Sequence, residues 1–401
     1  MTEHAAAADN PQVDHDVLIV GAGPVGLALA LALSGCGLDI VLADARPPKA
    51  AQTDPRTLAL AHGSRLSLEQ LGAWAALPVT PIESIHVSQH GGFGRTVLEA
   101  QEQGVDALGY VTSAGALAAT LRAAVDAAGI RVLHETEVGA LVAGADSVRA
   151  ALAGAGAPAA GLRFRLVACA EGGMREGERK VVDHDYHQHA LIARIEAEGG
   201  HQRRAFERFT ASGPLALLPD GDAFAMVHVV AAEAADALLA LDDAAYLQYL
   251  HAQLGERLRL RAVGQRLRYP LRLRYRTQTT AARTVWLGNA AQTLHPVAGQ
   301  GFNLALRDVM ELARCVREHL RRNDLADRDP GAPAVLSAYE RARRLDRQST
   351  IRFTDGLVRV FSNDFAPLRH ARGAALLALD LLPPLRGFLA RRMLFGARAW
   401  P

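Results

Sequence analysis

The sequence has few cysteines and no long apolar run, and these two absences narrow the class of protein. Only Cys36, Cys169 and Cys315 occur in 401 residues, and their spacing fits neither a metal centre nor a redox pair. We therefore expect buried, reduced cysteines and no metal. No apolar run reaches the ~20 residues that a membrane-spanning helix needs. Repeats and coiled-coil heptads are also missing, which leaves a globular chain long enough for two intertwined domains.

The amino-terminal residues and the charge pattern argue against a secreted protein and against a nucleic-acid partner. Residues 1–13 are rich in alanine and polar, without the basic and apolar pattern of a signal peptide, so we expect a cytoplasmic protein. The net charge is only +2. Residues 266–276 alternate arginine with leucine or tyrosine, which predicts a half-buried strand. No aromatic platform or nucleic-acid fold accompanies this strand, so we expect no nucleic-acid partner. Its arginine face is either a solvated surface or a docking surface for lipid headgroups or a partner.

A glycine-rich turn near the amino terminus predicts a dinucleotide-binding unit. The motif Gly21-x-Gly23-x-x-Gly26 follows a short apolar strand and opens a helix over residues 24–33. Gly21 allows a tight turn, Gly23 lets the backbone approach a pyrophosphate, and Gly26 allows close packing of helix on strand. A second strand then ends in Asp44, where a carboxylate is expected to bind a ribose hydroxyl.

A second strand–loop–helix unit lies near the other end of the chain. An apolar run over residues 284–287 enters a loop rich in glycine, proline and asparagine, residues 288–303, and a helical pattern follows over residues 304–316. Such a unit directs backbone N–H groups and a positive dipole end towards one point, where an anion or developing negative charge can be held. Two units of this kind suggest one long cofactor held at both ends, and a flavin dinucleotide fits this arrangement.

The matching residues extend beyond these motifs, and the chain resembles the aromatic flavin hydroxylases of ubiquinone biosynthesis, within the class A flavoprotein monooxygenases. The resemblance covers residues 14–400, and within the family the loop is most similar to the 2-polyprenyl-6-methoxyphenol hydroxylase branch. The residues that carry it are 16–27, 54–60, 71–74, 288–303 and 306–308.

The resemblance implies a reaction as well as a cofactor. It implies that FAD, with NAD(P)H as electron donor and O₂, hydroxylates a polyprenylated methoxyphenol through a flavin C4a-hydroperoxide. Two alternatives stay open, which are a flavin hydroxylase of another aromatic metabolite and a flavin-binding scaffold of a ubiquinone-biosynthesis complex. The second is motivated by an altered element over residues 169–178, where Arg175 and Glu178 replace the serine and arginine of relatives. The docking of the nicotinamide cofactor is therefore left open.

The resemblance also assigns roles to individual residues. Pro296 and His295 are carried over as catalytic residues, although a structural role for His295 is equally open, and no catalytic base is identified. The start of the helix at residues 299–303 is expected to stabilise the reduced flavin. The expected cofactor-binding residues are Gly21, Gly23, Gly26, Asp44, Arg56, Val138, Asn289, Gly299, Gln300, Gly301, Phe302 and Asn303.

The expected fold is α/β, with a Rossmann-like FAD-binding domain interleaved with a β-sheet substrate domain and followed by carboxy-terminal helices. The carboxy-terminal region holds twelve arginines against five acidic residues, and residues 374–392 are also apolar. This segment either contacts the inner face of an anionic membrane or packs as a terminal helix pair. The predicted segments are residues 14–81, 105–185 and 284–334 for FAD binding, 82–104 and 186–283 for the substrate domain, and 335–401 for the helices.

Overall fold

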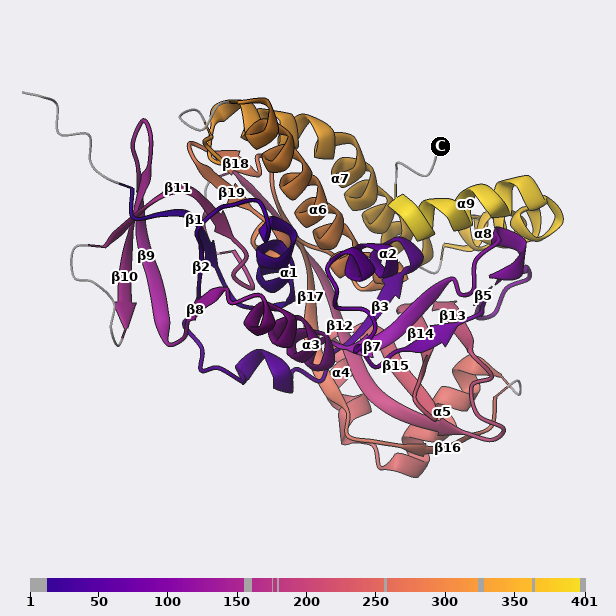
Figure 1. Ribbon diagram of the computed structural model, residues 1–401. Coiled ribbons are helices and arrows are strands. Elements are labelled where there is room, and N and C mark those ends of the chain that lie inside the picture. The colour runs from indigo at the N-terminus through magenta and orange to yellow at the C-terminus, as the bar shows by residue number, and fades with distance from the viewer. Residues whose placement is uncertain are drawn as a thin grey trace, which may run out of the picture.

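Two large sheets organise the chain, and helices cover them (Figure 1). The computed structural model describes residues 13–154, 161–174, 176–178, 180–255, 258–323, 328–362 and 365–396. Most of the amino-terminal segment on which the expected localisation rests lies outside these residues, and so does Arg175.

The first sheet, called the dinucleotide sheet below, is built on short parallel strands. β1 lies between β11 and β2, and β2 pairs with β8. Parallel strands are covered on both faces, which explains why the four residues of β2 are all apolar and buried. The order is β18-β19-β11-β1-β2-β8, and β9 and β10 extend the sheet from β11. Its strands are β1 (His15–Val20), β2 (Ile40–Ala43), β8 (Arg131–Leu133), β9 (Thr136–Ala143), β10 (Val148–Gly154), β11 (Leu162–Cys169), β18 (Thr280–Ala281) and β19 (Thr284–Trp286).

The second sheet, called the substrate sheet below, is mostly antiparallel. Its order is β20-β17-β12-β15-β14-β13-β5-β6, with β16 added beside β12. The edge strand β20 comes from the loop before α6, so this sheet contacts the predicted flavin loop directly. Its strands are β5 (Ser84–Gln89), β6 (Arg95–Glu99), β12 (Val181–Ala197), β13 (Arg204–Thr210), β14 (Gly213–Asp220), β15 (Ala223–Ala231), β16 (Leu260–Val263), β17 (Leu267–Arg276) and β20 (Gln292–Thr293).

A small sheet and several helices complete the fold. The small sheet has the order β3-β7-β4. Its strands are β3 (Thr57–Ala61), β4 (Thr80–Ile82) and β7 (Gly109–Ser113). The helices are α1 (Pro24–Leu33), α2 (His62–Gln70), α3 (Ala114–Ala127), α4 (Ala232–Ala240), α5 (Asp243–Leu254), α6 (Gln300–Arg322), α7 (Pro333–Phe361), α8 (Ala366–Leu381) and α9 (Pro383–Phe395). The short 3₁₀ turns are η1 (Ala50–Thr53), η2 (Gln101–Gln103), η3 (Gly288–Ala290) and η4 (Val297–Gly299).

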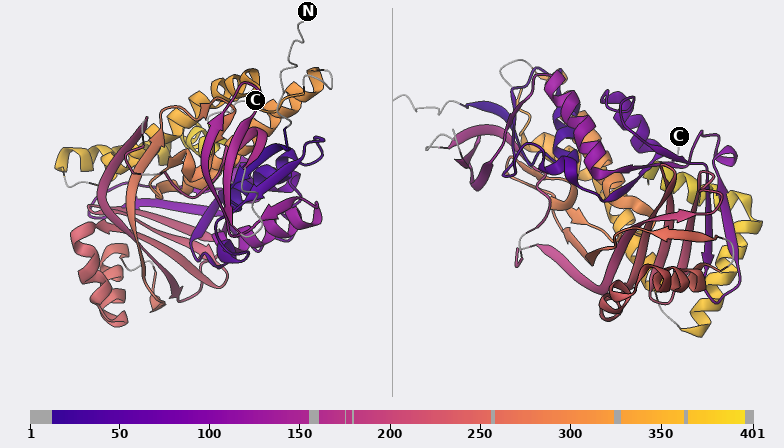
Figure 2. Two further views of the ribbon diagram at one scale, coloured as in Figure 1. Left: turned by 90° about the vertical axis from the view of Figure 1, so that its left-hand side faces the viewer. Right: turned by 90° about the horizontal axis from the view of Figure 1, so that it is seen from below.

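The two faces of the substrate sheet have different neighbours. One face packs against α4 and α5, where Leu217 and Met226 meet Tyr246 in an apolar cluster. The opposite face is called the flavin-side face, because its Phe209 packs against Val297 of η4. Figures 1 and 2 show α4 and α5 on one side of this sheet and α6 and α7 on the other. Side chains alternate between faces along each strand, so the register decides which residues face the flavin loop.

The expected fold class is confirmed. The helix predicted over residues 304–316 begins earlier, at Gln300, and extends to Arg322. The predicted domain bounds stay predictions. In the structure, the chain passes from the dinucleotide sheet to the substrate sheet between Cys169 and Val181, and it returns between Arg276 and Thr280.

The arginine-rich strand is β17, and its charges are matched locally. Arg266 pairs with Asp243 at 3.2 Å. Arg272 and Arg274 both reach Asp183 at 3.1 Å. The side chains of Arg266 and Arg274 are only 13% and 16% exposed. These ion pairs and this burial count against a docking surface for anionic headgroups, and they also show that only part of the arginine face is solvated.

Candidate active site

The glycine turn after β1 has the shape that close helix packing requires. Gly21 has φ +103°, a conformation that favours glycine. A Cβ atom on Gly26 would lie 1.9 Å from the carbonyl oxygen of Gly21, so a side chain has no room there. A Cβ atom on Gly23 would meet only a guanidinium nitrogen of Arg46, at 3.9 Å. The backbone at the start of α1 is therefore open, as an approaching pyrophosphate requires.

Asp44 directly follows β2, and its carboxylate lies beside the glycine turn. Its carboxylate accepts hydrogen bonds from the backbone N–H groups of Ala22 at 2.7 Å and Arg46 at 2.8 Å. Burial raises the pKa of Asp44, but its hydrogen bonds with Arg46 and Ala22 outweigh burial and lower the pKa below its usual value. The Arg46 side chain is 52% exposed, so a ribose hydroxyl can replace its bond to Asp44.

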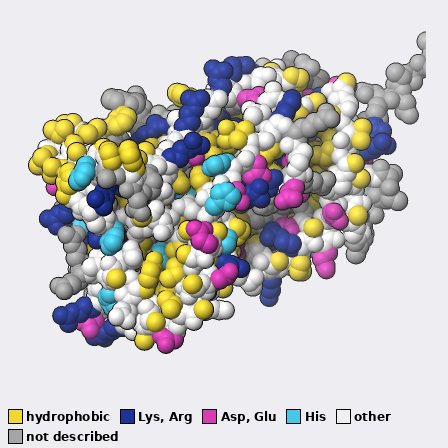
Figure 3. Space-filling model, turned by 180° about the vertical axis from the view of Figure 1, so that it is seen from behind, with side chains coloured by type: hydrophobic (Ala, Val, Ile, Leu, Met, Phe, Trp, Pro, Cys, Tyr) yellow, Lys and Arg dark blue, Asp and Glu magenta, His cyan; other side chains and the backbone are white. Residues whose placement is uncertain are grey.

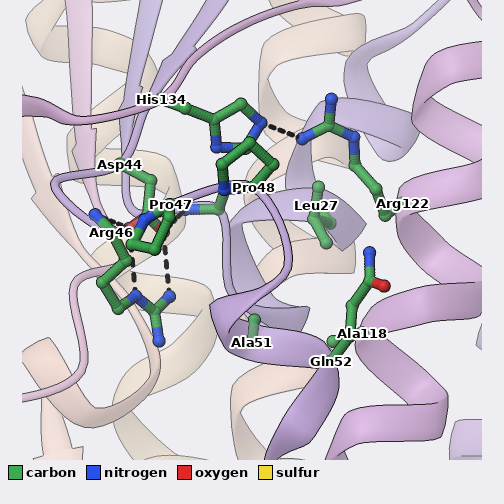
Figure 4. A pocket seen from close by; sticks show the side chains of 11 residues that line it. Leu27, Asp44, Arg46, Pro47, Pro48, Ala51, Gln52, Ala118, Arg122 and His134 are labelled. Carbon is green, nitrogen blue, oxygen red and sulfur yellow. Dashed lines mark hydrogen bonds and ion pairs between the residues drawn. The ribbon is translucent and has the colours of Figure 1, made fainter.

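The pocket around Asp44 includes residues that the sequence did not single out (Figure 4). His134 lies on the same side of the pocket as Asp44, and its ring contacts Arg122 of α3. Pro47, Pro48 and Gln52 complete much of the lining. Arg46, two residues after Asp44, could have been suspected from the sequence, whereas Arg122 and His134 come from distant elements. Val138 lies on β9, the strand that begins where Thr136 N–H donates to Asp44 O at 2.9 Å.

The loop before α6 ends in an exposed helix start. Ala298 and Gly299 both have left-handed backbone, with φ of 60° and 58°, and they turn the chain into α6. A Cβ atom on Gly301 would meet nothing within 4 Å. The first turn of α6 holds no acidic residue, so no charge within the helix neutralises its positive dipole end. Two open helix starts and a buried carboxylate are the features that FAD requires, and the residues present fit this cofactor.

The side chain of Asn303 holds the start of α6 in place. Its Oδ1 accepts hydrogen bonds from Ala61 N–H at 2.8 Å and Ser64 Oγ at 2.7 Å. Its Nδ2 donates to Ala59 O at 2.8 Å and Gly299 O at 2.7 Å. These bonds use the full capacity of the amide. Asn303 was predicted to bind the cofactor, and any such contact is left to its backbone.

His295 is completely buried beside the loop. Its Nδ1 accepts the N–H group of Val297 at 3.1 Å, which places the proton on Nε2. Among the described residues, Nε2 has no hydrogen-bond partner. The ring meets Tyr186 edge to face at 5.3 Å between centroids. Burial lowers the pKa of His295 to about 4, so the imidazole is neutral at ordinary pH.

The other predicted residues surround the same loop. Pro296 is the half-buried residue directly before η4, and Phe302 packs against the apolar core beside the dinucleotide sheet. Gln300 donates to Ala298 O at 3.1 Å and stabilises the turn. Arg56 precedes β3 and pairs with Asp54, while Asn289 is exposed in η3. Pro296, Gln300 and Phe302 thus lie together at the loop before α6, whereas no hydrogen bond or ion pair between Arg56 and this loop is found among the described residues. The contacts of all these residues with a cofactor stay predictions.

The altered element before β12 has a structural partner. Glu178, which stands where relatives carry arginine, accepts a bond from Arg276 Nη2 at 2.6 Å. Arg276 also donates to Ala290 O at 2.7 Å and stacks over Trp286 at 4.4 Å. Glu178 thus anchors the flavin loop through Arg276. Sequence reasoning missed this role because the two residues lie on different segments.

Comparisons with known proteins show the family and the fold. Residues 14–354 match the family model described as FAD binding domain. The chain is 34% identical to ubiquinone hydroxylase UbiL of Rhodospirillum rubrum, over 96% of this chain and 91% of that protein. It is 27% identical to 3-demethoxyubiquinol 3-hydroxylase of Escherichia coli, over 91% of this chain and 94% of that protein. The crystal structure of p-nitrophenol 4-monooxygenase PnpA from Pseudomonas putida superposes with a TM-score of 0.75 at 15% identity, covering 96% of this chain and 100% of that chain.

The packing at Gly26 predicts that Gly26→Ala releases FAD. The added methyl group must displace the Gly21 carbonyl, because only 1.9 Å separates them. Gly356→Ala is the matched control, since Gly356 is also helical and its Cβ would meet nothing within 4 Å. We expect the control to keep its flavin and gain roughly 0.5–1 kcal/mol of stability. The FAD content of both purified variants, read from their absorbance spectra, checks this, and stoichiometric FAD in Gly26→Ala would refute it.

The open helix start predicts an electrostatic effect at Gly301. In Gly301→Asp, a carboxylate opposes negative charge on the reduced flavin and lowers its reduction potential by roughly 20 mV, which is about 1 kcal/mol for a two-electron couple. Gly301→Asn is the neutral control of the same shape, and neither side chain clashes with its surroundings. Potentials measured against reference dyes test this. Equal potentials in the two variants would show that the start of α6 is not beside the flavin.

Proposed function

We propose that this chain, which belongs to the FAD-dependent aromatic hydroxylases of ubiquinone biosynthesis, hydroxylates a polyprenylated methoxyphenol, with NAD(P)H as the electron donor. The match over residues 14–354 and the near full-length relatedness to a ubiquinone hydroxylase establish the family. The substrate and the electron donor are the proposed part. The observation that supports the substrate proposal is the apolar cluster that joins the flavin-side face to η4, the turn that leads into α6.

Different residues of this chain would hold the two ends of the cofactor. The start of α1 and Asp44 would hold the pyrophosphate and ribose. The start of α6, fixed by Asn303, would lie against the isoalloxazine ring and stabilise negative charge there. When bound, the flavin supplies electron transfer from NAD(P)H and activation of O₂.

The flavin-side face supplies an apolar environment for an aromatic substrate. Phe209, Val297 and Val358 form a cluster there, and Tyr186 packs against it. The three cluster residues are only 3–7% exposed, and Phe209 stacks on Phe361 of α7 with ring centroids 3.8 Å apart. A phenolic ring would therefore bind at the margin of this cluster, beside the half-buried Tyr186, where apolar contact excludes water from the reacting oxygen. Because Pro296 immediately precedes Val297, a ring on this face would also lie near the predicted catalytic proline.

Product analysis tests the proposal directly. Purified enzyme is given NAD(P)H, ¹⁸O₂ and a methoxyphenol with either a polyprenyl tail or no tail. We expect one labelled oxygen atom in the polyprenyl product and a lower kcat/KM without the tail. Equal or better turnover of a tailless aromatic compound would favour a hydroxylase of a soluble metabolite. If no aromatic compound stimulates NAD(P)H consumption in the FAD-loaded protein, the scaffold alternative is favoured instead.

We propose that α8 and α9 collect this apolar substrate at an anionic membrane. No single helix among the described residues is long and apolar enough to cross a membrane; residues 367–381 and 383–395 pass that test only together, bent by 99°. Apolar side chains gather on the outside of this pair (Figure 3). The α8–α9 patch consists of Leu377, Leu381, Leu382, Leu385 and Phe388, which are between 42% and 67% exposed.

The segment 374–392 holds three arginines, Arg386, Arg391 and Arg392, and the first of them already has a protein partner. Arg386 donates to both carboxylate oxygens of Glu102, at 2.8 and 3.0 Å, and its side chain is 13% exposed. Arg391 is exposed and Arg392 is half-buried, so both are accessible to headgroups. Each would contribute up to ~1 kcal/mol near an anionic surface.

The patch predicts salt-sensitive binding to phosphatidylglycerol vesicles. Leu381→Glu with Phe388→Glu should weaken binding by at least roughly tenfold, because each change removes about 1.5–3 kcal/mol of apolar burial. Leu345→Glu on α7 is the control, since Leu345 is 74% exposed but lies outside the patch. Vesicle co-sedimentation at low and high salt measures the effect, and turnover of a tailless phenol should not change. Binding that ignores both the patch and salt would contradict the proposal.

A further inference from the structure

Glu207 lies in the middle of β13, on the flavin-side face of the substrate sheet. It is opposite Ala216 of β14 and Val87 of β5 in the strand register. Phe209 follows two residues later on the same face and contacts Val297 in the flavin loop. Glu207 and Phe209 are thus neighbours on one face of β13, and Phe209 contacts the loop.

The neighbours of Glu207 on β13 confirm this orientation. Phe206 packs into the apolar cluster beneath α5. Arg208 donates to the carbonyl oxygen of Gln253 on α5. Both side chains point to the face that α4 and α5 cover, so the side chain of Glu207, which lies between them, is on the flavin-side face.

The surroundings of Glu207 are apolar. Val87, Phe209 and Ala216 lie beside it. Within the part of the chain that the structure describes, its carboxyl group has no hydrogen bond or ion pair. Glu207 still keeps accessible surface, so it is not sealed in the core. Burial alone raises its pKa from 4.5 to about 7. An unpaired carboxyl group on an apolar face lowers stability, which is typical of a residue kept for function.

Three charged groups on the helices near this face have partners of their own. On α7, Asp355 accepts a hydrogen bond from Tyr186 at 3.0 Å and pairs with Arg359 at 2.9 Å. On α8, Arg372 donates to the carbonyl oxygens of residues 360 and 361. His295, the remaining titratable group of the loop, is neutral and its Nδ1 is occupied.

We propose that Glu207 is the catalytic base that accepts the proton of the substrate's phenolic hydroxyl group, an inference that rests on the proposed function. The phenolic O–H bond breaks, its proton moves to the carboxylate, and its electron pair stays on the oxygen. This raises electron density at the ring carbon that takes up one oxygen atom of O₂. The two electrons come from NAD(P)H, and the second oxygen atom leaves as water. The ring carbon then loses its hydrogen as a proton, and Glu207 returns its proton to the phenolic oxygen.

A base of this kind suits proton transfer near neutral pH. General bases work best when their pKa lies close to the operating pH, because the ionised form is then populated and still basic. His295 cannot replace it, since its free nitrogen carries the proton and its pKa is about 4.

Glu207→Gln keeps the shape of the side chain but removes the base. We expect hydroxylation to fall roughly 10²–10³-fold, while FAD stays bound and NAD(P)H consumption yields hydrogen peroxide. The wild-type rate should rise with pH through about 7, whereas the variant should lose this dependence. Glu196→Gln, an exposed position on β12, is the control and should behave as wild type. Glu207→Asp, which keeps a carboxyl group, should retain the pH dependence and serves where the glutamine variant fails to fold.

Thermal unfolding gives a readout independent of turnover. The folded pKa of Glu207 is raised, so wild type loses stability as pH rises from 4.5 through about 7. The Tm of Glu207→Gln should therefore exceed that of wild type at pH 8 and match it near pH 4.5. The inference would be overturned if Glu207→Gln hydroxylated the phenol with the same yield per NAD(P)H and the same pH dependence as wild type. An equal Tm of the two proteins at pH 8 would also overturn it. If wild type hydroxylates no phenol while the Tm difference is present, the proposed function fails instead.

Discussion

The position of the flavin loop depends on the buried carboxylate of Asp308. Asp308 is 1% exposed and accepts bonds from Gln292 Nε2 at 2.8 Å and Arg343 Nε at 2.6 Å. Gln292 in turn accepts from Arg347 Nε at 2.7 Å, and Arg347 reaches Arg276 O at 2.6 Å. One network thus joins α6, α7 and the edge of the substrate sheet. Removing one partner of a buried ion pair typically costs about 3–5 kcal/mol, because it leaves an uncompensated charge. The loop therefore has one well-defined arrangement relative to both sheets.

This constraint separates the residues that hold the site from the groups that face the cofactor. The side chains of Gln292, Asn303 and Asp308 are buried and bonded to protein. The groups that remain accessible to a cofactor are backbone groups at Gly301, where nothing lies within 4 Å of a Cβ position. Backbone donors cannot relax in the way that flexible side chains do, so they are well suited to stabilise charge that develops during a reaction. The long, specific loop sequence thus encodes a rigid backbone surface more than a set of side-chain contacts.

The sequence predicted the features that depend on local chain geometry. The turn at Gly21, the carboxylate of Asp44 and the helix after the loop follow from short motifs, and the structure places them as expected. Features that depend on strand register were not predictable. β13 lies between β14 and β5, and β5 is more than 100 residues away in the sequence. The sequence alone therefore does not show which face of the sheet carries Glu207. The pairings of Glu178 with Arg276 and of Arg386 with Glu102 likewise join segments far apart in sequence.

The charges around the ring site also constrain one another. The start of α6 favours negative charge on the flavin, and a permanently ionised carboxylate on the facing sheet would oppose it. A protonated histidine beside the loop would add positive charge where the phenolic ring is expected to bind. Burial removes both conflicts, because it lowers the pKa of His295 and raises that of Glu207. Both groups are then neutral or easily neutralised at the pH of the reaction. The apolar face is therefore what lets an anionic cofactor edge and a carboxyl group share one site.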